Sequence, residues 1–110
     1  MSPLHRALTL SLAAASATAM PGRGAAQDDK ALLPLRSLAA TCAQCHGTAG
    51  RPPEGSLVPP LAGLAEAYTI EQMAAFKTGN RPATVMTQLA KGFSEAQVRR
   101  LAAYFAAQPR

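Results

Sequence analysis

The stretch from Thr41 to Gly50 reads TCAQCHGTAG, and it contains both cysteines of this 110-residue chain and one of its two histidines. Two residues separate Cys42 from Cys45, and His46 follows the second cysteine directly. This pattern has three chemical interpretations: a redox dithiol, part of a zinc site, or an attachment site for haem. Features elsewhere in the chain distinguish them, and they determine the fold class as well.

The first two interpretations need features that the sequence does not supply. A redox pair of cysteines normally lies at a helix start among alternating strands and helices, whereas no segment here alternates with period two over a strand's length. Zinc needs three protein ligands in a catalytic site and four in a structural one. Beyond Cys42, Cys45 and His46, the chain has only His5 as a further nitrogen donor. Both interpretations are therefore disfavoured.

Haem attachment uses every residue of the motif. The two thiols add across the two vinyl groups of the porphyrin, and the histidine that follows becomes the proximal ligand of the iron. We therefore expect one covalent haem c, anchored by Cys42 and Cys45, with His46 as an axial ligand. Two cysteines allow one such attachment in this chain.

The sixth iron position separates electron transfer from ligand binding or peroxide chemistry. The soft donors downstream of His46 are Met73 and Met86. Met73 shares a predicted helix face with apolar residues, which is typical of core packing. Met86 lies in a proline-led segment that can cross the far face of the haem, so we predict Met86 as the second axial ligand. Met73 and an open site remain as alternatives, and Lys91 is a donor that could replace Met86 at high pH.

The first 26 residues resemble a secretory signal peptide in their order of features. Met1 to Arg6 carries charge, residues 7–17 are uncharged and mostly apolar, and small residues follow. The apolar run is shorter than the ~20 residues that span a bilayer as a helix. We expect a signal peptide over residues 1–26, cleaved after Ala19 or after Ala26, and one domain over residues 27–110 in the periplasm.

Three helices are predicted in that domain, so the fold class is all-α. The first precedes Cys42 and has its regular part starting near Pro34, since proline fits only a first helical turn. The second starts at Thr69, where a capping box is possible, and stops near Gly79. The third starts at Ser94 and places four apolar residues on one stripe: Val98, Leu101, Ala102 and Phe105. A short turn or helix is expected over residues 83–90, and the loop over residues 47–61 is rich in glycine and proline.

Composition and charge limit the classes of cofactor and partner that the chain could bind. From Gln27 onward the chain has five aromatic residues, no tryptophan and a net charge of +3. Small domains with so few large side chains depend on disulfides, metals or cofactors, and a flat apolar ligand would complete this core. No basic run with interleaved aromatics is present, which excludes a typical nucleic-acid interface. The mild positive charge favours an acidic partner.

The second nitrogen of a ligating imidazole is usually held by a hydrogen-bond acceptor. Pro59 is a candidate because its carbonyl lies in a stiff loop. Five residues are candidate walls of the haem pocket, although each could equally be ordinary core: Leu61, Leu64, Tyr68, Phe93 and Val98.

Taken together, these features resemble a class I cytochrome c across most of residues 27–110. The resemblance rests on the helix leading into Cys42–Gly47, the stretch VPPLAGL from Val58, the methionine-bearing segment and the last helix with Tyr104 and Phe105. It implies an all-α fold around one haem, with the first and last helices packed across each other. It also implies that the Pro59 carbonyl accepts from His46, that Leu61 lies near the haem and that Met86 binds the iron.

A narrower resemblance is carried by the stretch from Lys77 to Gln108, especially RPATVM and AKG. It is similar to the cytochrome subunit of flavocytochrome c sulfide dehydrogenases, including the single-haem versions. That resemblance implies an FAD-binding partner that oxidises sulfide, a soluble cytochrome as the next acceptor, and no substrate catalysis by this chain alone. The alternatives are a free soluble electron shuttle, a haem enzyme or sensor with an open sixth site, and a haem-free thiol oxidoreductase.

Overall fold

The computed structural model describes residues 24–110 as a set of helices joined by loops. No strand occurs in this part of the chain, so the predicted all-α fold class is confirmed. The elements in chain order are α1 (Gly24–His46), η1 (Thr48–Gly50), α2 (Glu66–Thr78), α3 (Met86–Leu89), η2 (Ala90–Gly92) and α4 (Glu95–Ala106).

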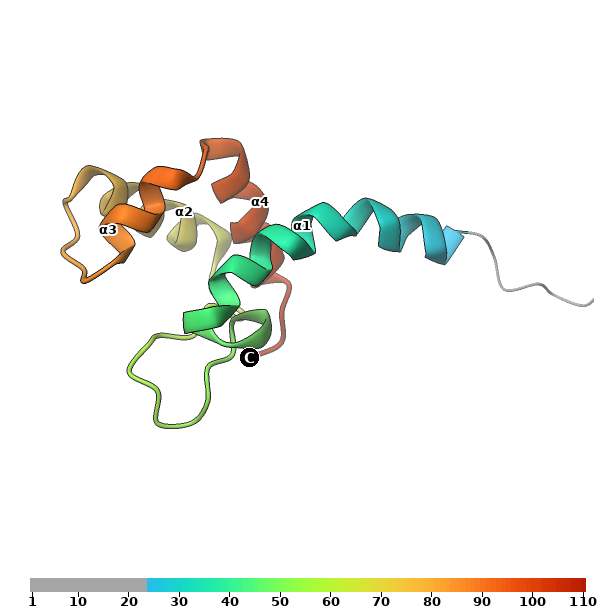
Figure 1. Cartoon of the computed structure of the whole chain (residues 1–110), viewed down its shortest axis with the longest axis horizontal. Helices are drawn as coiled ribbons and strands as arrows, with labels where there is room; N and C mark the ends of the chain where they lie inside the picture. The colour runs from blue at the N-terminus through green and yellow to red at the C-terminus, as the bar shows by residue number, and fades with distance from the viewer. Residues whose placement is uncertain (1–23) are drawn as a thin grey trace, which may run out of the picture.

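The core lies where α1 crosses α4. Ala39 of α1 and Leu101 and Phe105 of α4 form a buried cluster, and half-buried apolar side chains pack against it from α1, α4 and the loops. Helix α2 packs against α4 and α3. Figure 1 shows the N-terminal half of α1 projecting from this body, while the C-terminal end of the chain returns beside the loop that follows α1.

Helix α4 has the predicted start and the predicted buried stripe. The Ser94 hydroxyl accepts from the backbone N–H of Gln97 at 3.2 Å, and the Gln97 side chain accepts from the backbone N–H of Ser94 at 2.9 Å. This capping box satisfies two backbone donors that a helix start leaves free. The stripe of four apolar residues on α4 is buried, and it forms the α4 side of the core.

Two predicted helix starts were wrong. Helix α1 continues through Pro34 instead of starting near it. Proline removes the hydrogen bond to the carbonyl of Lys30, but Pro34 is exposed, so water can solvate that carbonyl. Helix α2 starts at Glu66, and the backbone N–H of Thr69 already donates to the carbonyl of Ala65. Thr69 is therefore inside the helix and cannot cap it. The predicted stop of α2 is confirmed, because Gly79 ends it in the left-handed conformation.

The short helix before α4 is shorter than expected, since α3 begins only at Met86. The predicted signal peptide lies almost wholly outside the described residues, including the cleavage site after Ala19, whereas Ala26 falls in the first turn of α1. Within residues 24–110, none of the helices combines the length and the apolar character that crossing a membrane requires.

Candidate functional site

The motif occupies the last turn and a half of α1. Cys42 and His46 are four residues apart and Cys45 lies between them, so a helix directs all three side chains toward neighbouring positions on one side. Cys42 is half-buried against the core cluster, Cys45 is exposed, and both thiols are free. Helix α1 thus carries two thiols and an imidazole within its last turn and a half.

Burial raises the pKa of the Cys42 thiol, and the Thr41 hydroxyl, 4.0 Å from the sulfur, offsets this only in part. The attacking cysteine of a redox dithiol needs a lowered pKa to be a thiolate near neutral pH. The shift at Cys42 is in the opposite direction. The thiol oxidoreductase alternative is therefore disfavoured by the structure as well.

His46 is buried and its ring is oriented by the following loop. Its Nδ1 lies 2.7 Å from the carbonyl oxygen of Pro59, the contact expected for Pro59. A carbonyl oxygen can only accept, so Nδ1 carries the proton and donates. In the neutral ring with this tautomer, the other nitrogen, Nε2, has the lone pair that binds a metal ion.

Two glycines give the loop after α1 its path. Gly47 ends α1 with φ of 79°, and a Cβ there would lie 2.0 Å from the carbonyl oxygen of Arg51. Gly50, with φ of 78°, accepts from the backbone N–H groups of Leu61 and Ala62 at 2.8 and 3.1 Å. Because these bonds attach the segment after Pro59 to the turn after His46, Gly50 positions the carbonyl that His46 contacts.

The C-terminal residues hold the same loop from the other side. The Arg51 side chain donates to the carbonyl of Pro109 at 2.9 Å, and the Arg110 side chain donates to the carbonyl of Gly63 at 3.0 Å. The backbone N–H of Gly63 donates to the carbonyl of Phe105 at 2.9 Å. The loop is therefore fastened to α4 and to the residues that follow it.

We expect Gly50→Ala to destabilise the protein strongly. A Cβ at Gly50 would lie 2.8 Å from the Ala62 nitrogen and 2.9 Å from the Phe105 ring. Crowding of a packed site costs about 1–3 kcal/mol, and the left-handed conformation adds about 1–2 kcal/mol for a residue with a Cβ. Denaturant unfolding of the two purified proteins measures the change in the free energy of unfolding.

Gly55→Ala is the matched control for this prediction. Gly55 has nearly the same φ, 80°, but a Cβ there would meet no atom within 4 Å. It should cost only the conformational contribution. If the two variants lose the same stability, contacts at Gly50 do not hold the loop and the assignment is wrong.

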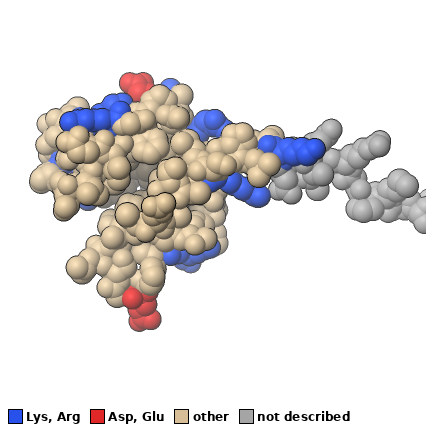
Figure 2. All heavy atoms as spheres, viewed as in Figure 1, with Lys and Arg blue, Asp and Glu red and all other residues tan. Residues whose placement is uncertain are grey.

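The two candidate methionines lie on different elements. Met86 is the first residue of α3 and is half-buried, while Met73 is half-buried in the middle of α2. Met73 lines a pocket between α2 and α4 together with Ile70 and Val98, which agrees with the packing role expected for it. Figure 2 shows a notch in the surface between the part built by α2 and α3 and the loop after α1.

The candidate wall residues divide into separate groups. Leu61 and Phe93 pack against the core cluster, Val98 is buried on α4, Leu64 is half-buried in the loop before α2, and Tyr68 is 46% exposed at the start of α2. Leu61, Phe93 and Val98 therefore belong to the core, which agrees with the alternative interpretation of these residues.

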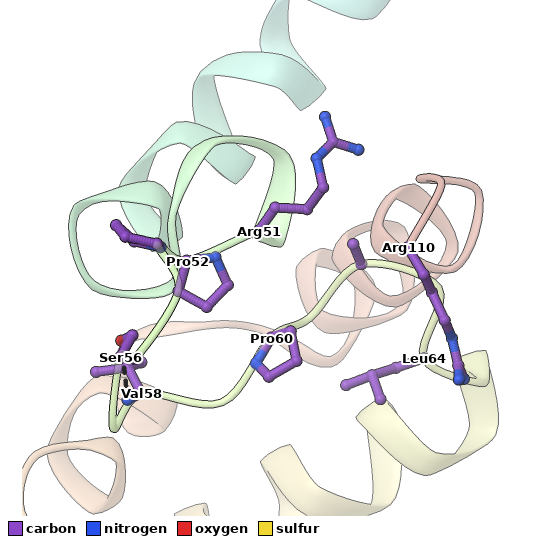
Figure 3. Close-up of a pocket in the computed structure, with 10 residues that line it drawn as sticks. Arg51, Pro52, Ser56, Val58, Pro60, Leu64 and Arg110 are labelled. Carbon is purple, nitrogen blue, oxygen red and sulfur yellow. Dashed lines mark hydrogen bonds between the residues drawn. The ribbon is translucent and has the colours of Figure 1, made fainter.

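A pocket of about 530 Å³ lies between residues 51–64 and Arg110. Figure 3 shows Pro52, Val58 and Pro60 on the loop side of it, with Leu64 and Arg110 on the other. Of the candidate haem-wall residues, Leu64 lines this pocket, whereas the predicted anchors and ligands Cys42, Cys45, His46 and Met86 do not. Among residues 24–110 no three His, Cys, Asp or Glu side chains form a group that could hold a metal ion.

The helical fold and the motif together define a class of protein, the c-type haem proteins, in which a Cys-x-x-Cys-His motif carries haem covalently. The family model for cytochrome c matches residues 36–108. The chain belongs to the cytochrome c family, whose members carry covalent haem c and transfer electrons.

Several relatives are electron-transfer proteins of sulfur metabolism or related cytochromes. The chain is 36% identical to a thiosulfate dehydrogenase electron acceptor of Thiomonas intermedia, covering 94% of this chain and 44% of the relative. It is 37% identical to the cytochrome subunit of sulfide dehydrogenase of Chlorobaculum tepidum, covering 62% of this chain and 60% of the relative. A solved cytochrome c4 of Acidithiobacillus ferrooxidans superposes with a TM-score of 0.57 at 32% identity, covering 82% of this chain and 52% of that one. The chain thus spans roughly half the length of these relatives.

The described residues fit the haem that the family carries. The thiols of Cys42 and Cys45 are free, and the protonated Nδ1 of His46 leaves Nε2 available as a donor. Among residues 30–110 the core is thin: three of the seven buried apolar residues are larger than alanine, whereas six large apolar side chains are at least 42% exposed. A large flat apolar group would supply the contacts that such a core needs.

Sequence reasoning proposed the donors but missed the residues that hold the loop after His46. Gly50, Arg51 and Arg110 had no motif to mark them, although a glycine shortly after a helix end is a general indication of a required positive φ. Each arginine donates to a backbone carbonyl that is distant in the sequence. No local sequence pattern predicts such a contact.

Proposed function

We propose that the chain is a periplasmic monohaem electron-transfer protein, with Cys42 and Cys45 as haem anchors and with His46 and Met86 as axial ligands. When bound, the haem supplies one-electron redox chemistry at its iron. The observation that supports this most directly is the 2.7 Å contact between His46 Nδ1 and the Pro59 carbonyl, which orients the imidazole of a helix end that also carries two free thiols. A methionine opposite the histidine favours a positive reduction potential.

The protein's own residues have three tasks in this proposal. Cys42 and Cys45 bind the cofactor, and the Pro59 carbonyl holds the proton of His46 at Nδ1. Met86 would be the second protein ligand of the iron, and there it would exclude water and small ligands. No proton is moved and no substrate is bound in this scheme, so the chain transfers electrons without catalysing a reaction alone.

We further propose that the electron donor is a dehydrogenase of reduced sulfur compounds. The cytochrome subunit of sulfide dehydrogenase among the relatives, together with the stretch RPATVM, supports an FAD-containing flavoprotein partner, with a soluble cytochrome as the next acceptor. A thiosulfate dehydrogenase is the second candidate donor, because the relative with that name aligns with 94% of this chain. A free soluble shuttle is the alternative to a stable subunit.

The test uses the chain produced with its haem attached. The intact mass should show one added haem. This result would exclude the alternative of a haem-free thiol oxidoreductase. The oxidised protein is then mixed with catalytic amounts of a sulfide dehydrogenase flavoprotein and sulfide, or of a thiosulfate dehydrogenase and thiosulfate, and its reduction is followed by visible absorption. Enzyme-dependent reduction in one arm identifies the donor class. Reduction in neither arm would contradict the sulfur assignment while leaving the haem assignment intact.

Gel filtration of the reacting pair separates the two partner models. A stable 1:1 complex with the flavoprotein supports a subunit. Separate elution despite rapid reduction supports a shuttle that binds only transiently.

A further inference from the structure

Arg81 makes three contacts that fasten the segment before Met86 to α2. Its backbone N–H donates to the carbonyl of Ala75 at 3.1 Å, and its side chain donates to Oε1 of Gln72. Its guanidinium carbon also lies 4.7 Å from the centre of the Phe76 ring, a cation–π contact. The backbone and the guanidinium group of Arg81 thus both contact α2.

The chain between Arg81 and α3 has little else to hold it. Residues 82–85 are exposed, and residues 82–84 make no backbone hydrogen bond within the described part of the chain. The next secured position is Val85, whose carbonyl accepts from Gln88 and Leu89 at the start of α3. Arg81 is therefore the last fixed residue before the exposed stretch over residues 82–84 that leads to Val85 and Met86.

Helix α3 also packs against α2, so the attachment at Arg81 adds to that packing. Helix α3 has only four residues, and Val85 and Leu89 on either side of its turn are about half exposed. Such a short helix has little stability of its own and depends on packing and on the ends of its connections. The position of Met86 is consequently sensitive to how the preceding segment is held.

We propose that Arg81 is a positioning residue for Met86: by binding Gln72 and Phe76 it holds the loop over residues 82–85 so that the Met86 sulfur stays on the iron. This inference rests on the proposed ligand Met86. In this proposal Arg81 acts through its contacts with α2. Its charge, whether at the protein surface or near the haem, is not what matters.

The experiment measures how easily an added ligand displaces Met86 from the oxidised haem protein. The probe is imidazole, and its binding is followed by loss of the methionine-to-iron charge-transfer band. A hydrogen bond to a charged group and a cation–π contact together favour the bound loop by enough to change an equilibrium about 10- to 100-fold. Arg81→Ala should therefore bind imidazole about 10- to 100-fold more tightly than the unaltered protein.

Two substitutions of uncharged residues test whether Arg81 acts through its contacts with Gln72 and Phe76 or through its charge. Gln72→Ala and Phe76→Leu each remove one partner of Arg81 and leave every charge in place, so each should tighten imidazole binding by a smaller factor. Combining Gln72→Ala with Arg81→Ala should add little beyond Arg81→Ala alone, because the two residues share one contact. Arg81→Lys should recover only part of the unaltered behaviour, since an ammonium lacks the planar fork of arginine.

Arg99→Ala is the charge-matched control. Arg99 lies on α4, its side chain is 61% exposed, and it faces Glu95 at 3.7 Å. Its loss should leave imidazole binding unchanged. The proposed role of Arg81 would be wrong if Arg81→Ala and Arg99→Ala had equal effects. It would also be wrong if Arg81→Ala had an effect and the Gln72 and Phe76 variants had none.

The design distinguishes failure of this inference from failure of the proposed ligand. If the unaltered protein lacks the methionine band, the Met86 assignment is wrong and this inference falls with it. If the band is present and the Arg81, Gln72 and Phe76 variants bind imidazole like the unaltered protein, only the role of Arg81 is wrong. Should Arg81→Ala not fold, the Gln72→Ala result decides.

Discussion

His46→Ala is expected to give a protein that keeps its covalent haem but loses the low-spin, two-ligand spectrum and most of its fixed tertiary structure. Cys42 and Cys45 would still anchor the porphyrin, whereas the iron would lose its nitrogen donor from α1. Metal coordination contributes directly to the stability of small domains that form their site only when folded. The Pro59 carbonyl would also lose the partner that now lies 2.7 Å away.

Visible absorption and near-ultraviolet circular dichroism measure the two parts of this prediction. Added imidazole should restore the low-spin spectrum, because it supplies the missing donor without a covalent link. Gln44→Ala is the control on the same turn of α1, since Gln44 is exposed, and it should leave both spectra unchanged. A His46→Ala protein with an unaltered two-ligand spectrum would show that another residue is the proximal ligand.

Met86→Ala is expected to open the sixth position of the iron. The methionine-to-iron band should disappear, the reduced protein should bind carbon monoxide at once, and the reduction potential should fall. Axial ligands set haem potentials over a range of about 0.8 V, and a methionine opposite a histidine raises the potential. We therefore expect a decrease that is a substantial fraction of that range, measured by redox titration.

Met73→Ala is the comparison that makes the Met86 prediction decisive. Met73 lines the pocket between α2 and α4, so its loss should reduce the free energy of unfolding and leave the methionine band in place. Deleting a fully buried methionine side chain costs about 2–5 kcal/mol, and a half-buried one should cost less. Loss of the band in Met73→Ala alone would transfer the ligand role to Met73. Carbon monoxide binding by the unaltered reduced protein would favour an open site.

The parts of the fold that depend on local chemistry were predictable. The start of α4 follows from the side chains of Ser94 and Gln97, which satisfy each other's backbone groups without any distant partner. The end of α2 at Gly79 follows from the freedom of glycine to adopt positive φ. Both predictions were confirmed because each requires only residues a few positions apart.

The predictions that failed were those in which a wider context outweighed a local preference. Thr69 has the residues of a capping box after it, yet α2 begins a turn earlier. Pro34 suggested a helix start, yet α1 runs through it on an exposed face. Propensity is a weak guide at such positions, since packing of the whole helix decides where it begins.

The site divides in the same way between sequence and structure. The sequence alone determined the haem-attachment motif and the all-α class, because the spacing of Cys42, Cys45 and His46 has a fixed meaning on a helix and in porphyrin chemistry. Only the tertiary structure decided how the loops run. Gly50 admits the backbone of Leu61 and Ala62 beside Phe105, and Arg81 binds Gln72 and Phe76 of α2. These contacts join segments whose approach depends on the packing of α1, α2 and α4, and no local spacing in the chain specifies that packing.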